Sequence, residues 1–254
     1  MRNKWIIILI LMAIIITIQI IHNSVSAKTT KDIGQINFLI GKPNDIKLQH
    51  RGDDDWYDAR LRAPVKEGDL VKTEKESRCE IKLNDGSMLR VGEETLYDLG
   101  EAEISNSHKK IHSKLHRGSI WANLASFFRK DDSFQILSPT AVCAVRGTVY
   151  RVSADSSTNI VVYDGEVDVG PVSFWNQQQL PPTQGLAPQE IPGPHEVPGP
   201  YEVSLDEWIR IVKGFQIDIR KDGKYQRSKI DLEKDSQSDW VQWNLERDKS
   251  IERE

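Results

Sequence analysis

Cysteine is scarce in this sequence and an excess of positive charge is missing, and each of these absences excludes a class of protein. Two Cys among 254 residues cannot build a disulfide-stapled scaffold, and their spacing fits no zinc-binding pattern. Lys and Arg total 34 against 38 Asp and Glu, so the formal net charge is −4. Without an excess of positive charge, the chain lacks the positive electrostatic potential that attracts the phosphate backbone of a nucleic acid. We therefore expect no nucleic-acid partner.

Motifs that carry chemistry are also missing. The sequence has no Gly-rich phosphate loop after a strand, no G-x-S-x-G nucleophile turn and no H-E-x-x-H zinc motif. Acidic residues are plentiful, but no context marks two of them as a catalytic acid and base. We therefore expect no catalytic residues, no cofactor and no metal site. An envelope glycan hydrolase that uses unmarked carboxylates is a minor alternative.

Long apolar runs are absent except at the N-terminus. Arg2 and Lys4 precede an almost uninterrupted apolar segment, Trp5–Ile21. Its length of about 17 residues lies between a signal-peptide core (about 7–15) and a membrane-spanning helix (about 20). Val25-Ser26-Ala27 behind it is a small-residue site of the A-x-A kind, which favours cleavage after Ala27. Residues 1–27 are therefore predicted to be a cleaved signal peptide or an uncleaved signal-anchor helix.

Both alternatives place the remaining chain outside the cytoplasm, because the basic residues stay inside. Cys79 and Cys143 would then lie in a compartment that permits disulfides. Each is surrounded by apolar or alternating residues, as a small core residue would be. We favour two core thiols and keep a disulfide between them as the alternative.

Residues 33–170 consist of short alternating segments separated by turn residues. The dipeptide Asp85-Gly86 lies between the alternating stretches Ile81–Leu83 and Met88–Val91, which is a strong hairpin signal. The same dipeptide recurs at Asp164-Gly165 and predicts a second hairpin. Turn residues about every 8–12 positions predict an all-β sandwich or roll of short antiparallel strands.

Residues 171–200 hold most of the 11 prolines of the chain and a short repeat, Pro192-Gly193-Pro194 and then Pro198-Gly199-Pro200. Proline lacks a backbone donor and fixes φ, so this stretch cannot join the interior of a sheet. We predict an extended, semi-rigid linker. Recognition of the repeat by an aromatic groove is the alternative.

Residues 201–254 are predicted to form a small mixed α/β tail. Ser204–Glu207 has the pattern of a capping box, and apolar residues follow at helical spacing from Trp208 to Phe215. These features predict a first helix. The turn residues Lys221–Lys224 then predict a hairpin.

A last amphipathic helix is predicted from about Gln237. Trp240, Trp243 and Arg247 lie on one stripe of it. A Trp-rich tail either folds back on the β body or presents a binding surface. Trp208, Trp240 and Trp243 are therefore candidate partner contacts.

Six motifs of the β body together match a pattern found in a known family. They are Trp56–Ala59, Gly68–Thr73, Leu83–Arg90, Arg117–Trp121, Pro139–Ala141 and Val145–Tyr150. With these motifs the chain resembles the FecR domain, a family named for the iron-dicitrate transport regulator of bacterial envelopes. The resemblance spans about Ile33 to Val169, and its most specific element is Pro139–Ala141 followed by Val145–Thr148.

The resemblance implies an all-β domain in the bacterial periplasm or envelope. Regulatory members of the family carry an antisigma segment before their membrane span, whereas only Met1–Lys4 precede the apolar run here. We expect an exported binding or scaffold protein without that segment, in envelope signalling. Its partner would be an envelope protein or a glycan, and the inner membrane if the N-terminal segment is kept. A protein-interaction module that uses the Pro repeat and the Trp-rich tail is the alternative.

Seven residues of the FecR-like motifs are predicted to have structural roles in turns and bulges. Glycine there supplies a positive φ or a close backbone approach. A guanidinium within a small, apolar stretch needs several acceptors, so we favour a structural role for Arg146 over ligand contact. The seven are Gly68, Asp69, Asp85, Gly86, Arg146, Gly147 and Thr148.

Two clusters of polar residues are candidate metal sites. His108, His112 and His116 recur every four residues, and on a helix they would share a face suited to zinc or copper. The alternating residues around them favour a strand, on which neighbouring His lie about 13 Å apart. We predict a basic, solvated strand face that anionic lipid or glycan could meet. Asp53–Asp55 lacks the spacing of a calcium loop, so we predict a solvated turn.

Overall fold

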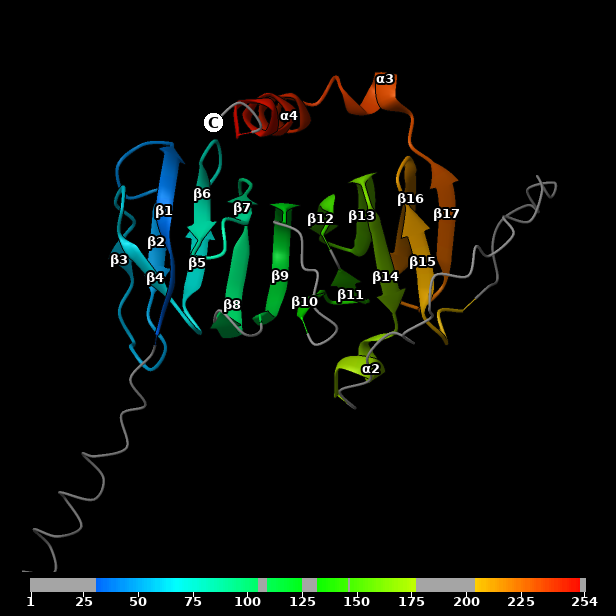
Figure 1. The fold of residues 1–254 in the computed structure, drawn as a ribbon, viewed down its shortest axis with the longest axis horizontal. Helices are drawn as coiled ribbons and strands as arrows, with labels where there is room; N and C mark the ends of the chain where they lie inside the picture. Colours follow the sequence, from blue (N-terminus) through cyan, green and yellow to red (C-terminus); the bar gives the residue numbers. More distant parts are fainter. Residues whose placement is uncertain (1–30, 105–108, 125–131, 146, 177–203, 252–254) are drawn as a thin grey trace, which may run out of the picture. The chain divides into compact units, whose positions relative to one another are not determined.

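A computed structural model describes residues 31–104, 109–124, 132–145, 147–176 and 204–251 (Figure 1). These residues are mostly strand, which confirms the predicted all-β class. The described residues from Asp32 onward group into one compact unit. Within the described ranges no helix is long and apolar enough to cross a membrane. The apolar run, Arg146 and the Pro repeat lie outside the described residues.

The strands form two ladders that share strand β9 (Lys109–Asn123). Sheet A has the order β4-β1-β6-β7-β9-β12-β13-β16-β17, and its pairs are antiparallel. Its other members are β1 (Asp32–Ile40), β4 (Pro64–Lys66), β6 (Arg78–Leu83), β7 (Met88–Val91), β12 (Val149–Ala154), β13 (Ser157–Asp164), β16 (Phe215–Arg220) and β17 (Tyr225–Lys229).

Sheet B has the order β3-β2-β5-β8-β9-β10-β11-β14-β15. The pair of β9 and β10 is parallel, and the other pairs of this sheet are antiparallel. Its other members are β2 (Ile46–Gln49), β3 (Tyr57–Asp58), β5 (Leu70–Thr73), β8 (Leu96–Ile104), β10 (Ser133–Leu137), β11 (Val142–Val145), β14 (Glu166–Gly170) and β15 (Ile209–Val212).

Strand β9 crosses from one sheet to the other at Gly118. Its residues up to Arg117 pair with β8 and β10, and its residues from Gly118 pair with β7 and β12. Gly118 has a φ of +90°, and a Cβ there would lie 2.5 Å from the Cα of Thr95. Only glycine combines this φ with such a close backbone approach. The residue therefore positions both sheets.

The two Asp-Gly dipeptides have different roles. Asp85-Gly86 closes the predicted hairpin between β6 and β7. Asp164-Gly165 was predicted to do the same, and that prediction is wrong: β13 pairs with β12 and β16, whereas β14 pairs with β11 and β15. Gly165 instead turns the chain from sheet A to sheet B. A tight turn fixes only the local direction of the chain. Which strands then pair depends on the apolar surface that their pairing buries.

The inner faces of both sheets bury one hydrophobic core. It includes Ile81 and Leu89 from sheet A together with Tyr97 and Phe134 from sheet B, all fully buried. Burial of this apolar surface is the main driving force for pairing the sheets.

Cys79 and Cys143 are both free and buried in this core. They are therefore the core thiols favoured above, and the alternative disulfide does not form. Burial, with a smaller contribution from Glu80, raises the pKa of Cys79 to about 12. The thiol is consequently protonated and unreactive at neutral pH.

The first helix predicted for the tail is wrong. The segment that contains Ile209 and Ile211 forms strand β15, and it turns at Gly214 into β16. Strand β15 pairs with β14, and β16 pairs with β13. The β-branched residues fit a pleated surface better than a helix, and two available strand edges supply partners. The tail therefore extends both sheets, and the predicted boundary does not separate it from the β body.

Three short helices complete the described chain, namely α2 (Val172–Asn176), α3 (Leu232–Asp235) and α4 (Asp239–Ile251) (Figure 1). Helix α4 confirms the last predicted helix, and β16 and β17 confirm the predicted hairpin. Helix α4 packs on the outer face of sheet A, where it meets residues of β1, β6, β7 and β9.

Candidate functional site

Helix α4 covers a set of charged and polar side chains on sheet A. Strand alternation directs Ile81 and Leu89 into the core, so that Glu80 and Arg90 point to the opposite face. Both charged side chains are nevertheless fully buried, as is Trp121 on β9. A face that alternation alone assigns to solvent is thus sealed by the C-terminal helix.

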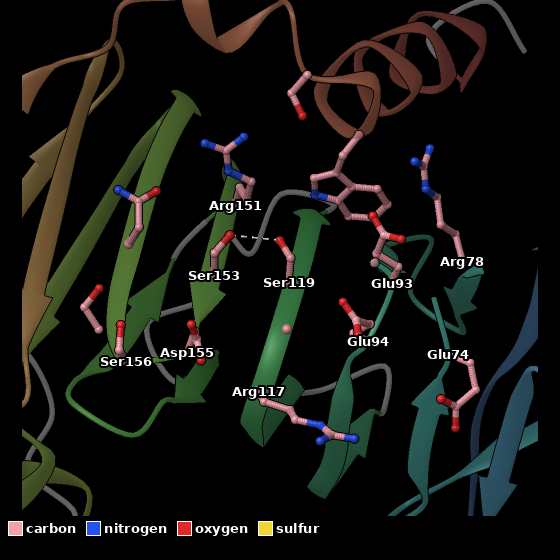
Figure 2. Close-up of a pocket in the computed structure, with 17 residues that line it drawn as sticks. Glu74, Arg78, Glu93, Glu94, Arg117, Ser119, Arg151, Ser153, Asp155 and Ser156 are labelled. Carbon is pink, nitrogen blue, oxygen red and sulfur yellow. Dashed lines mark hydrogen bonds between the residues drawn. The ribbon is translucent and has the colours of Figure 1, made fainter. Parts of the chain in front are cut away.

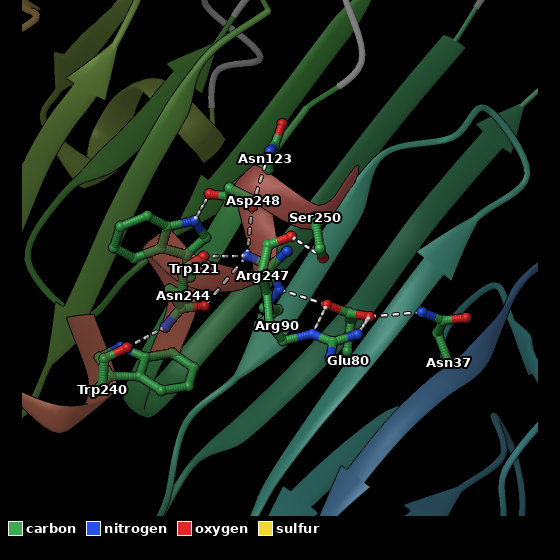
Figure 3. Close-up of polar contacts among 10 residues, drawn as sticks. All are labelled: Asn37, Glu80, Arg90, Trp121, Asn123, Trp240, Asn244, Arg247, Asp248 and Ser250. Carbon is green, nitrogen blue, oxygen red and sulfur yellow. Dashed lines mark hydrogen bonds and ion pairs between the residues drawn. The ribbon is translucent and has the colours of Figure 1, made fainter. Parts of the chain in front are cut away.

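Glu80 is the centre of the ion network (Figure 3). Its carboxylate accepts hydrogen bonds from Arg90 Nε at 2.6 Å, from Arg247 Nη2 at 2.7 Å and from Asn37 Nδ2 at 2.6 Å. Burial opposes ionisation of Glu80, but the hydrogen bonds from Arg247, Arg90 and Asn37 outweigh it and lower the pKa to about 2. Glu80 is therefore a carboxylate at neutral pH.

Asp248 ties the end of α4 to two strands (Figure 3). It accepts hydrogen bonds from Arg90 Nη1 at 2.7 Å, from Trp121 Nε1 at 2.9 Å and from Asn123 Nδ2 at 2.9 Å. These donors come from β7 and β9. Because charge-assisted hydrogen bonds have defined geometry, the network fixes the register of α4 on the sheet.

The three tryptophans proposed as partner contacts are each half-buried in contacts within the chain. Trp240 and Trp243 stack with ring centroids 5.5 Å apart, and the Arg78 guanidinium lies 5.5 Å from the Trp240 ring. Trp208 packs against Phe174 with centroids 5.4 Å apart. The tail therefore folds back on the β body, and a role of these residues in partner binding stays a prediction.

An open groove of about 740 Å³ lies beside α4 on the outer face of sheet A (Figure 2). Its residues come from strands β6, β9, β12 and β13, from the β5–β6, β7–β8 and β12–β13 turns, and from the N-terminal end of α4. They are Glu74, Arg78, Gly92, Glu93, Glu94, Arg117, Gly118, Ser119, Arg151, Ser153, Ala154, Asp155, Ser156, Ser157, Asn159, Ser238 and Trp240.

The charges of the groove have both signs, and several are already paired. Arg151 Nη2 donates to Asp235 Oδ1 at 2.8 Å, and Arg78 forms an ion pair with Asp239. The groove also contains exposed carboxylates and the exposed Arg117. Because no sign dominates, the groove has no field that favours a polyanion.

Three of the residues predicted to be structural glycines have the expected backbone. Gly68, Gly86 and Gly147 have φ of +80°, +90° and +56°. Arg146 lies outside the described residues. Gly165, which the sequence also placed in a turn, has a φ of +77°. A Cβ at this position would lie 2.9 Å from the carbonyl oxygen of Gly147.

The polar members of the predicted set stabilise turns. Asp69 is buried, accepts the Lys66 N–H at 2.8 Å and contacts His50 Nδ1 at 2.9 Å. Asp85 accepts the Ser87 N–H at 2.9 Å, and the Thr148 hydroxyl donates to the carbonyl oxygen of Glu166 at 2.9 Å. These are the contacts that a structural role requires, and the role itself stays a prediction.

Replacement of Gly147 by Val should strain the turn, because a β-branched residue at φ of +56° costs about 1–3 kcal/mol. In a chain of this size that corresponds to a fall in melting temperature of roughly 2–12 °C, which thermal unfolding followed by circular dichroism measures. His112→Ala is the comparison, and it should cost less. A larger effect of the His112 substitution would contradict the structural assignment of Gly147.

The predicted strand at the histidines is confirmed, since His112 and His116 lie on β9. His112 is half-buried with its ring 5.5 Å from that of Trp175, and burial lowers its pKa. His116 is exposed, and His108 lies outside the described residues. The described ranges contain no group of three or more His, Cys, Asp or Glu arranged to hold a metal ion, and Asp53–Asp55 is exposed.

The sequence reasoning missed Glu80, Arg90 and Asp248. Arg90 follows two apolar residues and precedes a third, which is an unusual place for a solvated charge. The complementary pair Arg247-Asp248 lies over 150 positions away, so only the fold brings the charges together.

A comparison with protein families agrees with the resemblance stated from the motifs. Residues 69–168 match the family model described as FecR protein. No curated protein matches. Two crystal structures of a candidate anti-sigma factor from Parabacteroides distasonis ATCC 8503, at 1.65 and 2.50 Å resolution, are each 14% identical with a TM-score of 0.43. Each match covers 64% of this chain and 60% of the other.

Proposed function

We propose that this chain, which contains a FecR domain at residues 69–168, is an exported, non-catalytic binding module of the bacterial cell envelope with a role in signalling. The FecR match carries this proposal. The apolar run behind Arg2 and Lys4 supports export, because a basic start before such a run is typical of export signals.

Ligand binding is assigned to the groove beside α4. Its floor belongs to three neighbouring strands of one sheet, and the ion network around Glu80 holds α4 as one wall. A site on regular elements with supported side chains keeps its geometry when a ligand enters. The lining residues include no His and no Cys, so the described groove lacks a nucleophile with a neighbouring imidazole base.

Export is tested with the full chain carrying a C-terminal tag in a bacterial host. Fractionation combined with protease treatment of intact spheroplasts should find the folded chain outside the cytoplasmic membrane. Replacing Ile10 and Ile14 within the apolar run by Asp should retain it in the cytoplasm. A wild-type chain found only in the cytoplasmic fraction would contradict the proposal.

Binding is tested by co-sedimentation of the purified chain with washed cell envelopes. Ser156 is exposed and lines the groove, so Ser156→Trp should obstruct it and weaken binding at least tenfold. Ser250→Trp, at an exposed site on α4 outside the groove lining, is the matched control and should bind like the wild type. Absence of binding by the wild type, or release of soluble envelope fragments by it, would refute a non-catalytic binding module.

A further inference from the structure

Beside seven charged side chains, the groove is lined by six neutral ones that both donate and accept hydrogen bonds. The serine hydroxyls and the side-chain amide of Asn159 each donate and accept hydrogen bonds, as the hydroxyls of a sugar do. Ser119 and Ser153 face each other with their oxygens 3.0 Å apart (Figure 2). The set is Ser119, Ser153, Ser156, Ser157, Ser238 and Asn159.

An indole forms the wall at the α4 end of the groove. Trp240 combines an apolar ring with one N–H donor, which suits a ligand with apolar C–H faces and polar edges. Trp240 Nε1 and Arg151 Nε are buried and have no acceptor among the described residues. An unpaired buried donor costs about 1–3 kcal/mol. Both residues line the groove, so a ligand oxygen that reached these donors would remove that cost.

Strand pairing argues against an extended peptide as the ligand. Peptides that bind to sheets usually add a strand to a free edge. The strands β9, β12 and β13 beneath the groove each pair on both sides within sheet A. The floor therefore presents side chains and no backbone ladder. The mixed charges of the walls argue equally against a phosphate-rich polymer.

We propose that the groove binds a neutral oligosaccharide segment of an envelope glycan, with Trp240 as a platform and the serine hydroxyls and Asn159 as hydrogen-bonding partners. This inference rests on the proposed binding function and names its ligand class. A volume of about 740 Å³ lies in the upper part of the range of about 300–1,000 Å³ for ligand sites, so several linked sugar rings fit better than one.

The test compares chemically treated envelopes in the co-sedimentation assay. Protease-treated envelopes should bind the wild-type chain as untreated ones do, whereas periodate, which cleaves vicinal diols of sugars, should reduce binding at least tenfold. Loss of binding after protease treatment together with retention after periodate would overturn the inference and leave the proposed function intact. Failure to bind untreated envelopes would refute the proposed function itself.

Two variants and a salt series complete the test. Trp240→Phe keeps an aromatic ring but removes the N–H donor, and it should weaken binding to protease-treated envelopes by roughly 3- to 10-fold, whereas Ser250→Trp should not. Binding should change less than about threefold between 50 and 500 mM NaCl, because a neutral ligand releases few counterions. A steep loss with salt, or an unchanged Trp240→Phe variant, would overturn the neutral oligosaccharide.

Discussion

Replacing Glu80 by Gln should lower the free energy of unfolding by about 3–5 kcal/mol, because the change leaves buried positive charge without its counter-charge. Arg90 is fully buried and donates to Glu80, and Arg247 donates two hydrogen bonds to the same carboxylate. Urea unfolding followed by Trp fluorescence measures the loss. Glu233→Gln, at an exposed site on α3, is the control and should change stability by less than about 0.5 kcal/mol.

The same substitution should change how stability depends on pH. The folded-state pKa of Glu80 is lowered to about 2, and the unfolded value is about 4.3. A lowered pKa means that the stabilisation is fully present above the unfolded value and is lost as pH falls through the folded value. The wild type should therefore lose this stability between about pH 5 and pH 2. Glu80→Gln should lack that component. Equal acid sensitivity of the two proteins would show that Glu80 is not the ionised centre of the network.

Replacing Gly118 by Ala should cost roughly 3–6 kcal/mol, the sum of two effects. Alanine at a φ of +90° is strained, and its Cβ would lie 2.5 Å from the Cα of Thr95, which cannot move without shifting β9 against the β7–β8 turn. Gly86→Ala separates the two effects, because Gly86 also has a φ of +90° but a Cβ there would meet nothing within 4 Å. It should cost only the strain, about 1–3 kcal/mol.

Urea unfolding of both variants gives the difference directly. A Gly118→Ala variant that is clearly less stable than Gly86→Ala would assign the excess to the close approach at the point where β9 changes sheets. Equal stability would mean that backbone strain accounts for the whole effect and that the two sheets tolerate a side chain at this crossing.

Short-range signals predicted the turns well and the partners of their strands poorly. Asp85-Gly86 and Asp164-Gly165 look alike in sequence, and Gly86 and Gly165 both have positive φ. The first closes a hairpin, while the second sends the chain into the other sheet. Turn geometry depends on adjacent residues, but strand pairing depends on the apolar surface that distant segments bury together.

The tail shows the same limit. The spacing from Trp208 to Phe215 fits a helix, yet these residues form β15 and begin β16 because β13 and β14 offer edges to pair with. A helical period is a weak preference, and tertiary pairing can override it when the residues are β-branched. Helix α4 was predicted correctly for two reasons. Its amphipathic stripe extends over 13 residues, and none of the described strands pairs with this segment.

The sequence by itself determined the all-β class, the positive φ of the turn glycines, the FecR-like motifs and the last helix, since each depends on neighbouring residues or on a local period. Only the tertiary structure decided that Glu80 and Arg90 are buried, because strand alternation assigns them to the outer face. Their burial requires Arg247 and Asp248 from a helix more than 150 residues away. A charged side chain is buried at low cost only together with such partners, and the helix that supplies them, α4, also forms one wall of the groove.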